Sequence, residues 1–253
     1  MKLIVYKVFL LYDLAPIRGG ISPLFFNFKI MKNKKELKAV CFGEVLWDVF
    51  PSHKKIGGAP LNVALRMKAL GVDSNIISRV GSDEDGAEIL SYINNQNVNS
   101  DSIQVGEDYK TGVVNVMINE KGNASYDILY PSSWDKITLT KEMIEKVSES
   151  DVFIFGSLIC RDEISRSTLY ALLDKAKYKV FDANLRAPYY TTEVLLELMS
   201  KADFIKLNDE ELWEISRKLE SPYNSFEQNI KFIAEKTNAK QVCVTKGAFG
   251  AVL

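Results

Sequence analysis

Short apolar strands and amphipathic helices alternate along this chain from residue 38 onward, and this alternation limits the possible folds more than any other feature. Residues 38–50 form an apolar run typical of a first buried strand. Residues 60–71 then place apolar side chains at helical spacing and end at a glycine. A strand over 75–81 and a helix over 83–98 follow. Such an alternation predicts a parallel sheet covered by helices.

One stretch departs from this rhythm. Residues 111–119 and 124–129 alternate apolar and polar side chains with a period of two around a turn at 120–123, which predicts a hairpin of a small separate sheet. The alternation of helices and strands then resumes, with segments expected at 141–150, 152–158, 165–177, 179–185, 192–202, 204–208, 209–219, 224–237 and 241–247. The final residues 251–253 read as the start of another strand. A sheet ending there would have an unfinished edge, so we expect the native chain to continue beyond Leu253 or another element to complete it.

Residues 1–36 precede this pattern, and for them the sequence predicts no definite structure. They are apolar and aromatic, but Lys7 and Asp13 interrupt them before a span of membrane length is reached. A signal peptide would need a continuous apolar region and a small-residue cleavage site, and neither is clear. We therefore expect no membrane partner. The Lys-rich stretch after Met31 leaves open whether translation begins at Met1 or at Met31.

Composition narrows the classes of partner. The 32 Lys and Arg residues and 33 Asp and Glu residues leave a formal charge of -1, which provides no field for nucleic acid. A small-molecule partner is expected instead. Cys41, Cys160 and Cys243 lie far apart in apolar runs, and His53 is the single histidine of the sequence. This pattern argues against a zinc site and a disulfide scaffold and favours a reducing, cytoplasmic location.

Polar residues that follow the predicted strands are the candidate site, because ligands of open parallel sheets bind beyond the carboxyl ends of the strands. Glycines allow close approach of the backbone to a ligand, and an amide side chain can both donate to and accept from a hydroxyl. The sequence offers five such places: Gly43-Glu44 with Asp48, residues 57–62, Asn184 with Arg186, Asn208 with Glu211, and residues 245–250.

The order of these segments resembles the pfkB-type carbohydrate kinases, the ribokinase/fructokinase family, and is closest to bacterial fructokinase. Residues 56–81 match the first signature of that family, including the spacing to Gly71 and Gly81. The resemblance extends over roughly residues 38 to 253, through FGEVLWD, GGAPLNVA, FGSLICR, FDANLR, KLNDEE and VTKGAFGA in the expected order. It implies an α/β fold with a ribokinase-like, mostly parallel sheet flanked by helices and a small β lid. Residues 37–253 would form this kinase domain, C-terminally incomplete, after the extension 1–36.

The resemblance also implies a sugar site. In such kinases the Asp after the first strand and the Asn of the glycine segment bind sugar hydroxyls, which corresponds to Asp48 and Asn62. Gly57 and Gly58 lie beside them, and Asn184 follows a later strand. A carboxylate suits this role because it can accept hydrogen bonds from two adjacent hydroxyls.

The segments near residues 48–57 and 109–130 would form the lid of such a kinase. Lid closure over the sugar would exclude water, which otherwise competes as the phosphoryl acceptor. The alternative is that the hairpin mediates dimerisation. Lids of this family often do both, so a homodimer formed through the lid is the expectation.

A nucleotide site is implied at the neighbouring strand ends. Arg186 would neutralise phosphate charge during transfer, although a structural ion pair is the alternative for this residue. Asn208 and Glu211 match an Asn-x-x-Glu element that organises Mg²⁺ and phosphate, with Glu211 acting through water. An ordinary helix start would give the same pattern. Residues Thr245, Gly247 and Gly250 resemble the family's Thr-x-Gly-x-x-Gly element near the nucleotide phosphates.

The family's Gly-Ala-Gly-Asp element, whose Asp is the catalytic base, is absent from this sequence and would follow Leu253. No catalytic base is therefore assigned within the chain. We expect the full protein to phosphorylate a sugar with ATP and Mg²⁺, with fructose as the leading substrate, and this chain itself to be inactive. The alternative is a non-catalytic sugar-binding or regulatory fragment. Neither the sugar nor the oligomeric state follows from the sequence.

Overall fold

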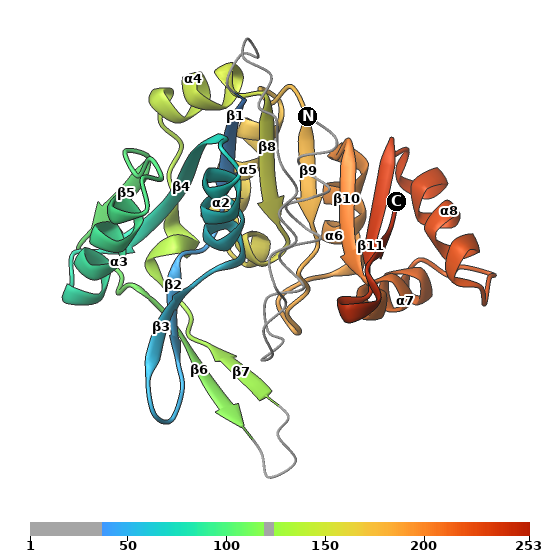
Figure 1. The fold of residues 1–253 in the computed structure, drawn as a ribbon, viewed down its shortest axis with the longest axis horizontal. Coiled ribbons are helices and arrows are strands. Elements are labelled where there is room, and N and C mark those ends of the chain that lie inside the picture. The colour runs from blue at the N-terminus through green and yellow to red at the C-terminus, as the bar shows by residue number, and fades with distance from the viewer. Residues whose placement is uncertain (1–36, 119–123) are drawn as a thin grey trace.

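The computed structural model describes residues 37–118 and 124–253. In this part of the chain, eight strands form one sheet and four strands form a smaller sheet that projects from it (Figure 1). The strand order of the large sheet is β12-β11-β10-β9-β8-β1-β4-β5, and that of the small sheet is β3-β2-β6-β7. In the large sheet β12 runs antiparallel to its neighbour, and the other recorded pairs are parallel. The predicted class, a mostly parallel α/β sheet with a small β appendage, is confirmed.

The strands are β1 (Lys38–Phe42), β2 (Leu46–Val49), β3 (Lys54–Gly57), β4 (Asp73–Gly81), β5 (Ile103–Gly106), β6 (Gly112–Ile118), β7 (Ala124–Ile128), β8 (Val152–Gly156), β9 (Lys179–Asp182), β10 (Phe204–Asn208), β11 (Gln241–Thr245) and β12 (Ala251–Val252). The helices are α2 (Ala59–Ala69), α3 (Glu84–Asn95), α4 (Lys141–Glu149), α5 (Glu163–Leu173), α6 (Thr192–Lys201), α7 (Asp209–Lys218) and α8 (Phe226–Thr237), with 3-10 turns η1 (Ser133–Lys136), η2 (Leu158–Arg161) and η3 (Gly247–Phe249).

Both faces of the large sheet are covered, because its central strands are apolar on both sides. In β1, Val40 and Phe42 belong to one buried cluster, which includes residues of α4 to α8. Ala39 and Cys41 point the other way, into a second cluster with residues of α2 and α3. Side chains of successive strand residues alternate between faces, so a continuous apolar run gives a strand buried on both sides.

Side-chain caps define where several helices begin. Thr140 accepts a hydrogen bond from the backbone N–H of Met143 at the start of α4, and Thr191 does the same for α6. Asp83 and Ser225 cap α3 and α8 in the same way. Each cap satisfies a backbone donor that the first turn of a helix leaves without an intrahelical partner.

The prediction of a single strand over residues 38–50 is wrong. The chain leaves the large sheet after β1 and enters the small sheet as β2, with the change at Gly43. Gly43 has a φ of +148°, and a Cβ atom there would lie 2.6 Å from the Pro60 ring. The apolar pattern hid this break because both strands are buried.

The predicted hairpin is confirmed as β6 and β7, which pair in antiparallel register with Val114 opposite Ile128. Its turn at 120–123 lies outside the described residues. The small sheet also contains β2 and β3, which pair in antiparallel register, and β2 runs parallel to β6. The sequence analysis placed β3 within the lid segment near residues 48–57 and did not identify β5 as a strand. Residues 251 and 252 form the strand β12, which pairs with β11 at the edge of the large sheet.

None of the helices in residues 37–118 and 124–253 combines the length and the apolar composition that crossing a membrane requires.

Candidate functional site

A cavity of about 770 Å³ lies between the small sheet, helix α2 and the carboxyl ends of central strands. It is the place where most of the predicted sugar-binding residues meet. Its lining consists of Glu44, Leu46, Asp48, Phe50, Lys55, Gly58, Ala59, Asn62, Leu65, Arg66, Ala69, Val114, Tyr126, Ile128, Leu158, Asn184 and Arg186.

One row of side chains across the small sheet forms a wall of this cavity. Asp48 on β2 lies opposite Lys55 on β3 and opposite Val114 on β6. Val114 in turn lies opposite Ile128 on β7. Directly opposite residues share a face of a sheet, so these four side chains face the cavity together.

Helix α2 forms the second wall. Ala59, Asn62, Arg66 and Ala69 all line the cavity, and their spacing of three or four residues puts them on one helical face. The helix begins after Gly58, whose φ of +109° favours glycine, and a Cβ atom there would collide with the backbone oxygen of Glu44. This close approach brings the start of α2 against the end of β1.

The segment after β9 closes the cavity with Asn184 and Arg186. Asn184 has a φ of +39°, a conformation that Asn tolerates better than most residues. The Arg186 guanidinium donates to the Leu185 carbonyl at 2.8 Å and lies 5.7 Å from the centre of the Tyr126 ring. The structure thus brings Asp48, Gly58, Asn62, Asn184 and Arg186 into one cavity. Gly57 does not line it, and instead packs against the Asp48 carboxylate, which leaves no room for a side chain.

Burial makes the two carboxyl groups of the cavity easier to protonate. Burial raises the pKa of Asp48, while Lys55 and Arg186 oppose this effect. Burial raises the pKa of Glu44 to about 7. The charge of Arg186 lowers this pKa, but its effect is smaller than that of burial. The Glu44 side chain accepts the Ala59 N–H through Oε1 at 3.2 Å, whereas its Oε2 has no hydrogen-bond partner within the described residues. This carboxyl therefore has hydrogen-bonding capacity that the protein itself does not use.

The predicted nucleotide residues lie beside the cavity and do not line it. Asn208 ends β10 directly opposite Thr245 on β11. Asn208 Oδ1 accepts the Glu211 N–H at 2.7 Å, and Glu211 Oε2 accepts the Asn208 N–H at 2.8 Å. The second Glu211 oxygen accepts the Leu185 N–H at 2.8 Å. Asn208 and Glu211 therefore do form a capped helix start, which was the alternative considered for this pair. The bond from Glu211 to Leu185 also holds the segment that carries Arg186.

The fit of these residues to Mg²⁺ is limited to contact through water. In residues 37–118 and 124–253 no three His, Cys, Asp or Glu side chains form a cluster that could hold a metal ion. Both oxygens of Glu211 already accept backbone N–H groups. Mg²⁺ keeps several waters when it binds with phosphates, so an indirect contact suits the chemistry of this carboxylate.

The glycine segment after β11 is open. Gly247 and Gly250 have φ values of +52° and +83°, and a Cβ atom at either position would meet nothing within 4 Å. Thr245 is buried and donates its hydroxyl to the Leu207 carbonyl at 3.2 Å, whereas Phe249 is 87% exposed. Backbone conformation, not crowding, is thus what favours glycine at these two positions.

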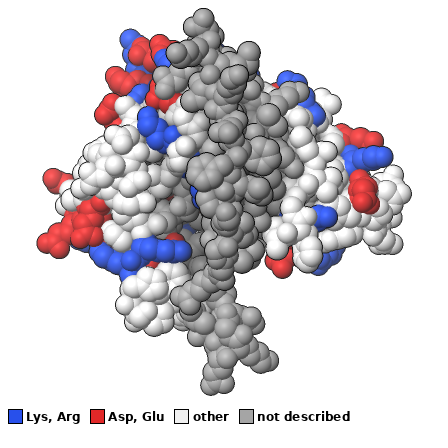
Figure 2. All heavy atoms as spheres, viewed as in Figure 1, with Lys and Arg blue, Asp and Glu red and all other residues white. Residues whose placement is uncertain are grey.

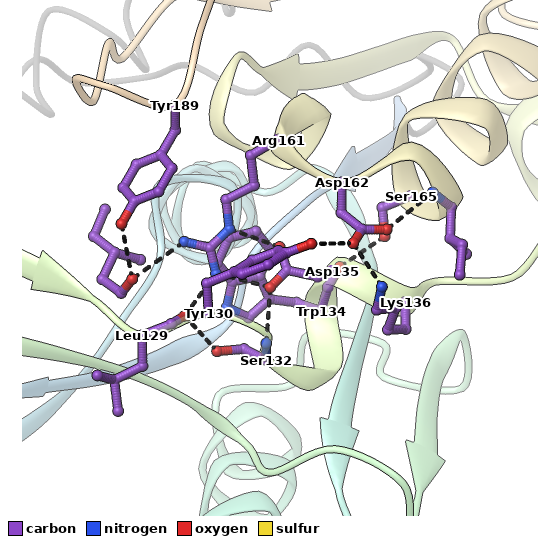
Figure 3. A network of polar contacts seen from close by, with 12 residues as sticks. Leu129, Tyr130, Ser132, Trp134, Asp135, Lys136, Arg161, Asp162, Ser165 and Tyr189 are labelled. Atoms are coloured by element: carbon purple, nitrogen blue, oxygen red, sulfur yellow. Dashed lines mark hydrogen bonds and ion pairs between the residues drawn. The ribbon is translucent and has the colours of Figure 1, made fainter.

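A buried cluster of charged residues ties the small sheet to the large domain (Figure 3). Arg161 forms two hydrogen bonds with the Asp135 carboxylate, at 2.7 and 2.8 Å, and donates to the Leu129 carbonyl at 2.7 Å. Its guanidinium also lies 4.0 Å from the centre of the Trp134 ring. Leu129 directly follows β7, so this cluster holds one end of the sheet that forms the cavity wall.

Lys136, Tyr130 and Asp162 complete this group, which we call the Arg161 cluster. The Asp162 carboxylate accepts from Lys136 at 2.6 Å and from the Tyr130 hydroxyl at 3.0 Å. In the view of Figure 3 every carboxylate of the cluster points toward a positive or hydroxyl group.

Sequence reasoning missed several residues of the site. Arg66 could have been found from helical spacing, because it lies four residues after Asn62 and therefore on the same face. Lys55 and Tyr126 required the strand register, and Glu44 required the position of the start of α2. The Arg161–Asp135 pair joins residues far apart in sequence, so no local pattern indicates it.

Comparison with known proteins supports this description. A family model described as pfkB family carbohydrate kinase matches residues 30–253. The chain is 28% identical over 233 residues to a probable chloroplastic fructokinase of Arabidopsis thaliana, covering 83% of this chain and 60% of that protein. It is 33% identical over 177 residues to a putative sugar kinase of Pyrococcus horikoshii, covering 66% of this chain and 56% of that protein.

Among solved structures, a fructokinase from Xylella fastidiosa with bound ATP has a TM-score of 0.73 at 22% identity and covers 85% of this chain and 73% of that one. This likeness confirms the ribokinase-like fold. The chain spans 60% and 56% of the lengths of the two curated relatives named above.

Proposed function

This chain belongs to the pfkB family of carbohydrate kinases, and we propose that its protein transfers a phosphoryl group from ATP to a hydroxyl of a sugar. Fructose is the leading substrate, because the relatives include proteins named as fructokinases. The observation that carries the proposal is the convergence of Asp48, Asn62 and Asn184 on one cavity. A carboxylate and two amides together provide the acceptors and donors that a sugar with adjacent hydroxyls requires.

The cavity residues have distinct roles in this proposal. Asp48 accepts hydrogen bonds from two adjacent hydroxyls. A charged acceptor forms stronger hydrogen bonds with hydroxyls than a neutral acceptor does. Asn62 and Asn184 each donate to one sugar oxygen and accept from another. The small sheet acts as a lid whose row of Lys55, Val114 and Ile128 moves toward the sugar and displaces water.

The nucleotide is proposed to bind along the ends of β10 and β11. Asn208, Thr245, Gly247 and Gly250 would supply polar groups and an open backbone for its phosphates, and Glu211 would hold Mg²⁺ through water. The metal ion would neutralise charge on the phosphates. Arg186 would stabilise the charge on the transferring group from its position between the two sites.

Residues 1–253 contain no Gly-Ala-Gly-Asp element, and no other residue is assigned as the base. Asp182 at the end of β9 is buried, with Oδ1 3.4 Å from Lys206 Nζ, and a neighbouring ammonium makes a carboxylate a weaker base. We therefore expect residues 1–253 to bind sugar with little phosphoryl transfer. A non-catalytic sugar-binding or regulatory role is the second candidate, favoured by the same observation.

Calorimetric titration of residues 1–253 with fructose tests the binding part of this proposal, and ADP release from ATP with fructose present tests the catalytic part. Asp48→Asn should weaken fructose binding by about 10- to 100-fold, since it removes a charged acceptor. Asp174→Asn, at an exposed position at the end of α5, is the matched control and should not change the affinity. Loss of affinity in both variants, or in neither, would contradict the assignment of Asp48.

Rapid ADP release that depends on fructose would show that the chain carries its own base and would contradict the non-catalytic alternative. Heat of binding without ADP release would favour the non-catalytic alternative.

Two further properties belong to this proposal. Free, buried cysteines at positions 41, 160 and 243 support a reducing cytoplasmic location. A homodimer formed through the lid would cover Met117, which is 56% exposed on β6. Light scattering of wild type and Met117→Lys tests the dimer, since a charge within the contact should produce monomers.

A further inference from the structure

The cavity contains more positive than negative side chains. Lys55, Arg66 and Arg186 line it together with only two acids, Glu44 and Asp48. Figure 2 shows Lys and Arg side chains gathered where the small sheet joins the large domain, beside the acidic start of α3. A neutral sugar offers hydroxyls, which carboxylates and amides bind well, and it gives no reason for Lys55 and Arg66, whereas Arg186 is proposed to serve the transferring group.

The three cations are Lys55, Arg66 and Arg186, and two of them, Lys55 and Arg186, act electrostatically on Asp48. Within the described part of the chain, none of them forms an ion pair. Lys54, the neighbour of Lys55, is bonded to Asp85 at 2.8 Å and to Glu88 at 3.1 Å. Like charges within one cavity repel each other, and a bound anion would remove that repulsion.

The positions of the cations suggest separate tasks. Arg186 follows β9, whose neighbour β10 carries the proposed nucleotide residues. Arg66 is on α2, which packs on β1, β4 and β8. In the strand order of the large sheet, β9 lies between β8 and β10, so β9 separates the strands under α2 from β10. Lys55 lies on the small sheet opposite Asp48. Arg66 and Lys55 are therefore associated with the sugar end of the cavity.

Arg66 lies four residues beyond Asn62 on the same face of α2, about 6 Å along the helix axis. The cavity continues along this face to Ala69. Asn62 and Arg66 therefore face neighbouring parts of the same cavity.

We propose that the sugar bound in this cavity carries a negatively charged group, phosphate or carboxylate, and that Arg66 and Lys55 bind it. This inference rests on the proposed phosphoryl transfer to a sugar, and it replaces fructose with an anionic sugar as the leading substrate. Guanidinium and ammonium groups both form charge-assisted hydrogen bonds to phosphate and carboxylate oxygens, and Arg can do so with two parallel bonds.

Titration of residues 1–253 with D-fructose, D-fructose 6-phosphate and D-gluconate tests the inference. At least one of the two anionic sugars should bind about tenfold or more tightly than fructose, and the advantage should shrink as the salt concentration rises. Tighter binding of the phosphate identifies a sugar phosphate, and tighter binding of gluconate identifies a sugar acid.

Arg66→Gln and Lys55→Gln should each remove most of this advantage of the anionic sugar over fructose. Lys68→Gln is the matched control, because Lys68 is a cation on the same helix that does not line the cavity. Thermal melts of the variants should stay close to wild type, and Lys55, which is exposed on β3, provides a variant with little risk to folding.

Three results would overturn the inference. If fructose binds at least as tightly as both anionic sugars, the inference fails while the proposed function stands. If none of the three sugars binds, both fail. If Arg66→Gln and Lys55→Gln weaken the binding of ATP and leave that of the anionic sugar unchanged, the cations serve the nucleotide and the inference fails.

Discussion

The Arg161 cluster and the cavity contain similar residue types in opposite states. In the Arg161 cluster, Asp135 and Asp162 accept hydrogen bonds from Arg161, Lys136 and Tyr130. In the cavity, the three cations form no ion pair within the described residues, and Glu44 Oε2 has no hydrogen-bond partner there. The carboxylates of the Arg161 cluster thus have hydrogen-bond partners, whereas polar groups of the cavity are left with hydrogen-bonding capacity.

The difference shows which polar groups serve the fold and which await a ligand. A buried charge is costly unless it is paired and hydrogen-bonded, so a cluster that satisfies every carboxylate contributes to specificity of the fold. Groups left without partners in a cavity cost stability in the free protein and gain partners on binding. The predictions below test this distinction, beginning with the largest expected effect.

Removing Arg161 should give the largest effect. Arg161→Met leaves the Asp135 carboxylate buried without its partner, and breaking a buried ion pair from one side costs roughly 3–5 kcal/mol. The side chains of the pair are 2% and 0% exposed, so solvent cannot take over the role of the arginine. Urea unfolding followed by circular dichroism measures the change in the free energy of unfolding.

Arg166→Met is the matched control, since it removes the same side chain five residues later on α5, and it should have a much smaller effect. The double variant Arg161→Met/Asp135→Asn should lose less stability than the sum of the two single variants. Strict additivity would mean that the pair is not coupled, and the contrast with the cavity would fail.

Glu44 should make stability depend on pH. Its pKa in the folded protein is about 7, above the ordinary value of 4.5, because burial disfavours its charged form. The folded state therefore binds the proton more tightly than the unfolded state, and stability falls as the pH rises from 4.5 through 7. The interval corresponds to roughly 3 kcal/mol. Arg186 and Asp182, which act on this carboxyl in opposite directions, are the charged groups that modify the effect.

Glu44→Gln removes this titration and keeps an acceptor for the Ala59 N–H. The variant should therefore gain stability relative to wild type as the pH rises from 4.5 to 8, with the gain measured by urea unfolding at several pH values. Glu235→Gln, on the exposed face of α8, is the control, and its stability should depend on pH in the same way as that of wild type. A constant difference between wild type and Glu44→Gln across this range would show that Glu44 is charged throughout.

The sequence predicted most of the elements because their signals are local. Alternating apolar runs indicated the strands and helices of the large sheet, and the period of two indicated β6 and β7. The break at Gly43 was missed because β1 and β2 are both buried, and hydrophobicity does not report which sheet a strand joins. Strand β3 was placed in the lid only through the family resemblance, because its two lysines give it no apolar run.

Part of the site was also predicted from local sequence signals. Asp48, Asn62, Asn184 and Arg186 belong to short motifs, and the structure brings them together in one cavity. The excess of positive charge was not predicted, since it arises from register across the small sheet and from one face of α2. Contacts between distant segments, such as Arg161 with Asp135, depend on tertiary packing and have no local signal.

Asn208 tests whether a polar group can serve both the fold and a ligand. Asn208→Ala removes the cap of α7 and should cost about 1 kcal/mol of unfolding free energy. Asn208→Asp retains an oxygen that can accept the Glu211 N–H, so it should restore most of the stability. The same substitution places a negative charge beside the proposed phosphate site and should weaken ATP binding, measured by calorimetry. Unchanged ATP affinity in both variants would leave Asn208 with a capping role alone.

The smallest effect is expected at Lys54, and the comparison with Lys55 is the sharpest that the chain offers. Lys54 is paired with Asp85 and Glu88 on the exposed start of α3, and its ammonium lies 4.0 Å from the centre of the Trp47 ring. Exposed ion pairs contribute little because water competes for both partners, so Lys54→Gln should shift Tm by no more than about 2 °C. It should also leave sugar affinity unchanged, whereas Lys55→Gln should weaken binding of an anionic sugar. Equal losses of affinity at both positions would mean that the general positive charge of the small sheet attracts the sugar, and the distinction between paired and unpaired lysines would have no bearing on binding.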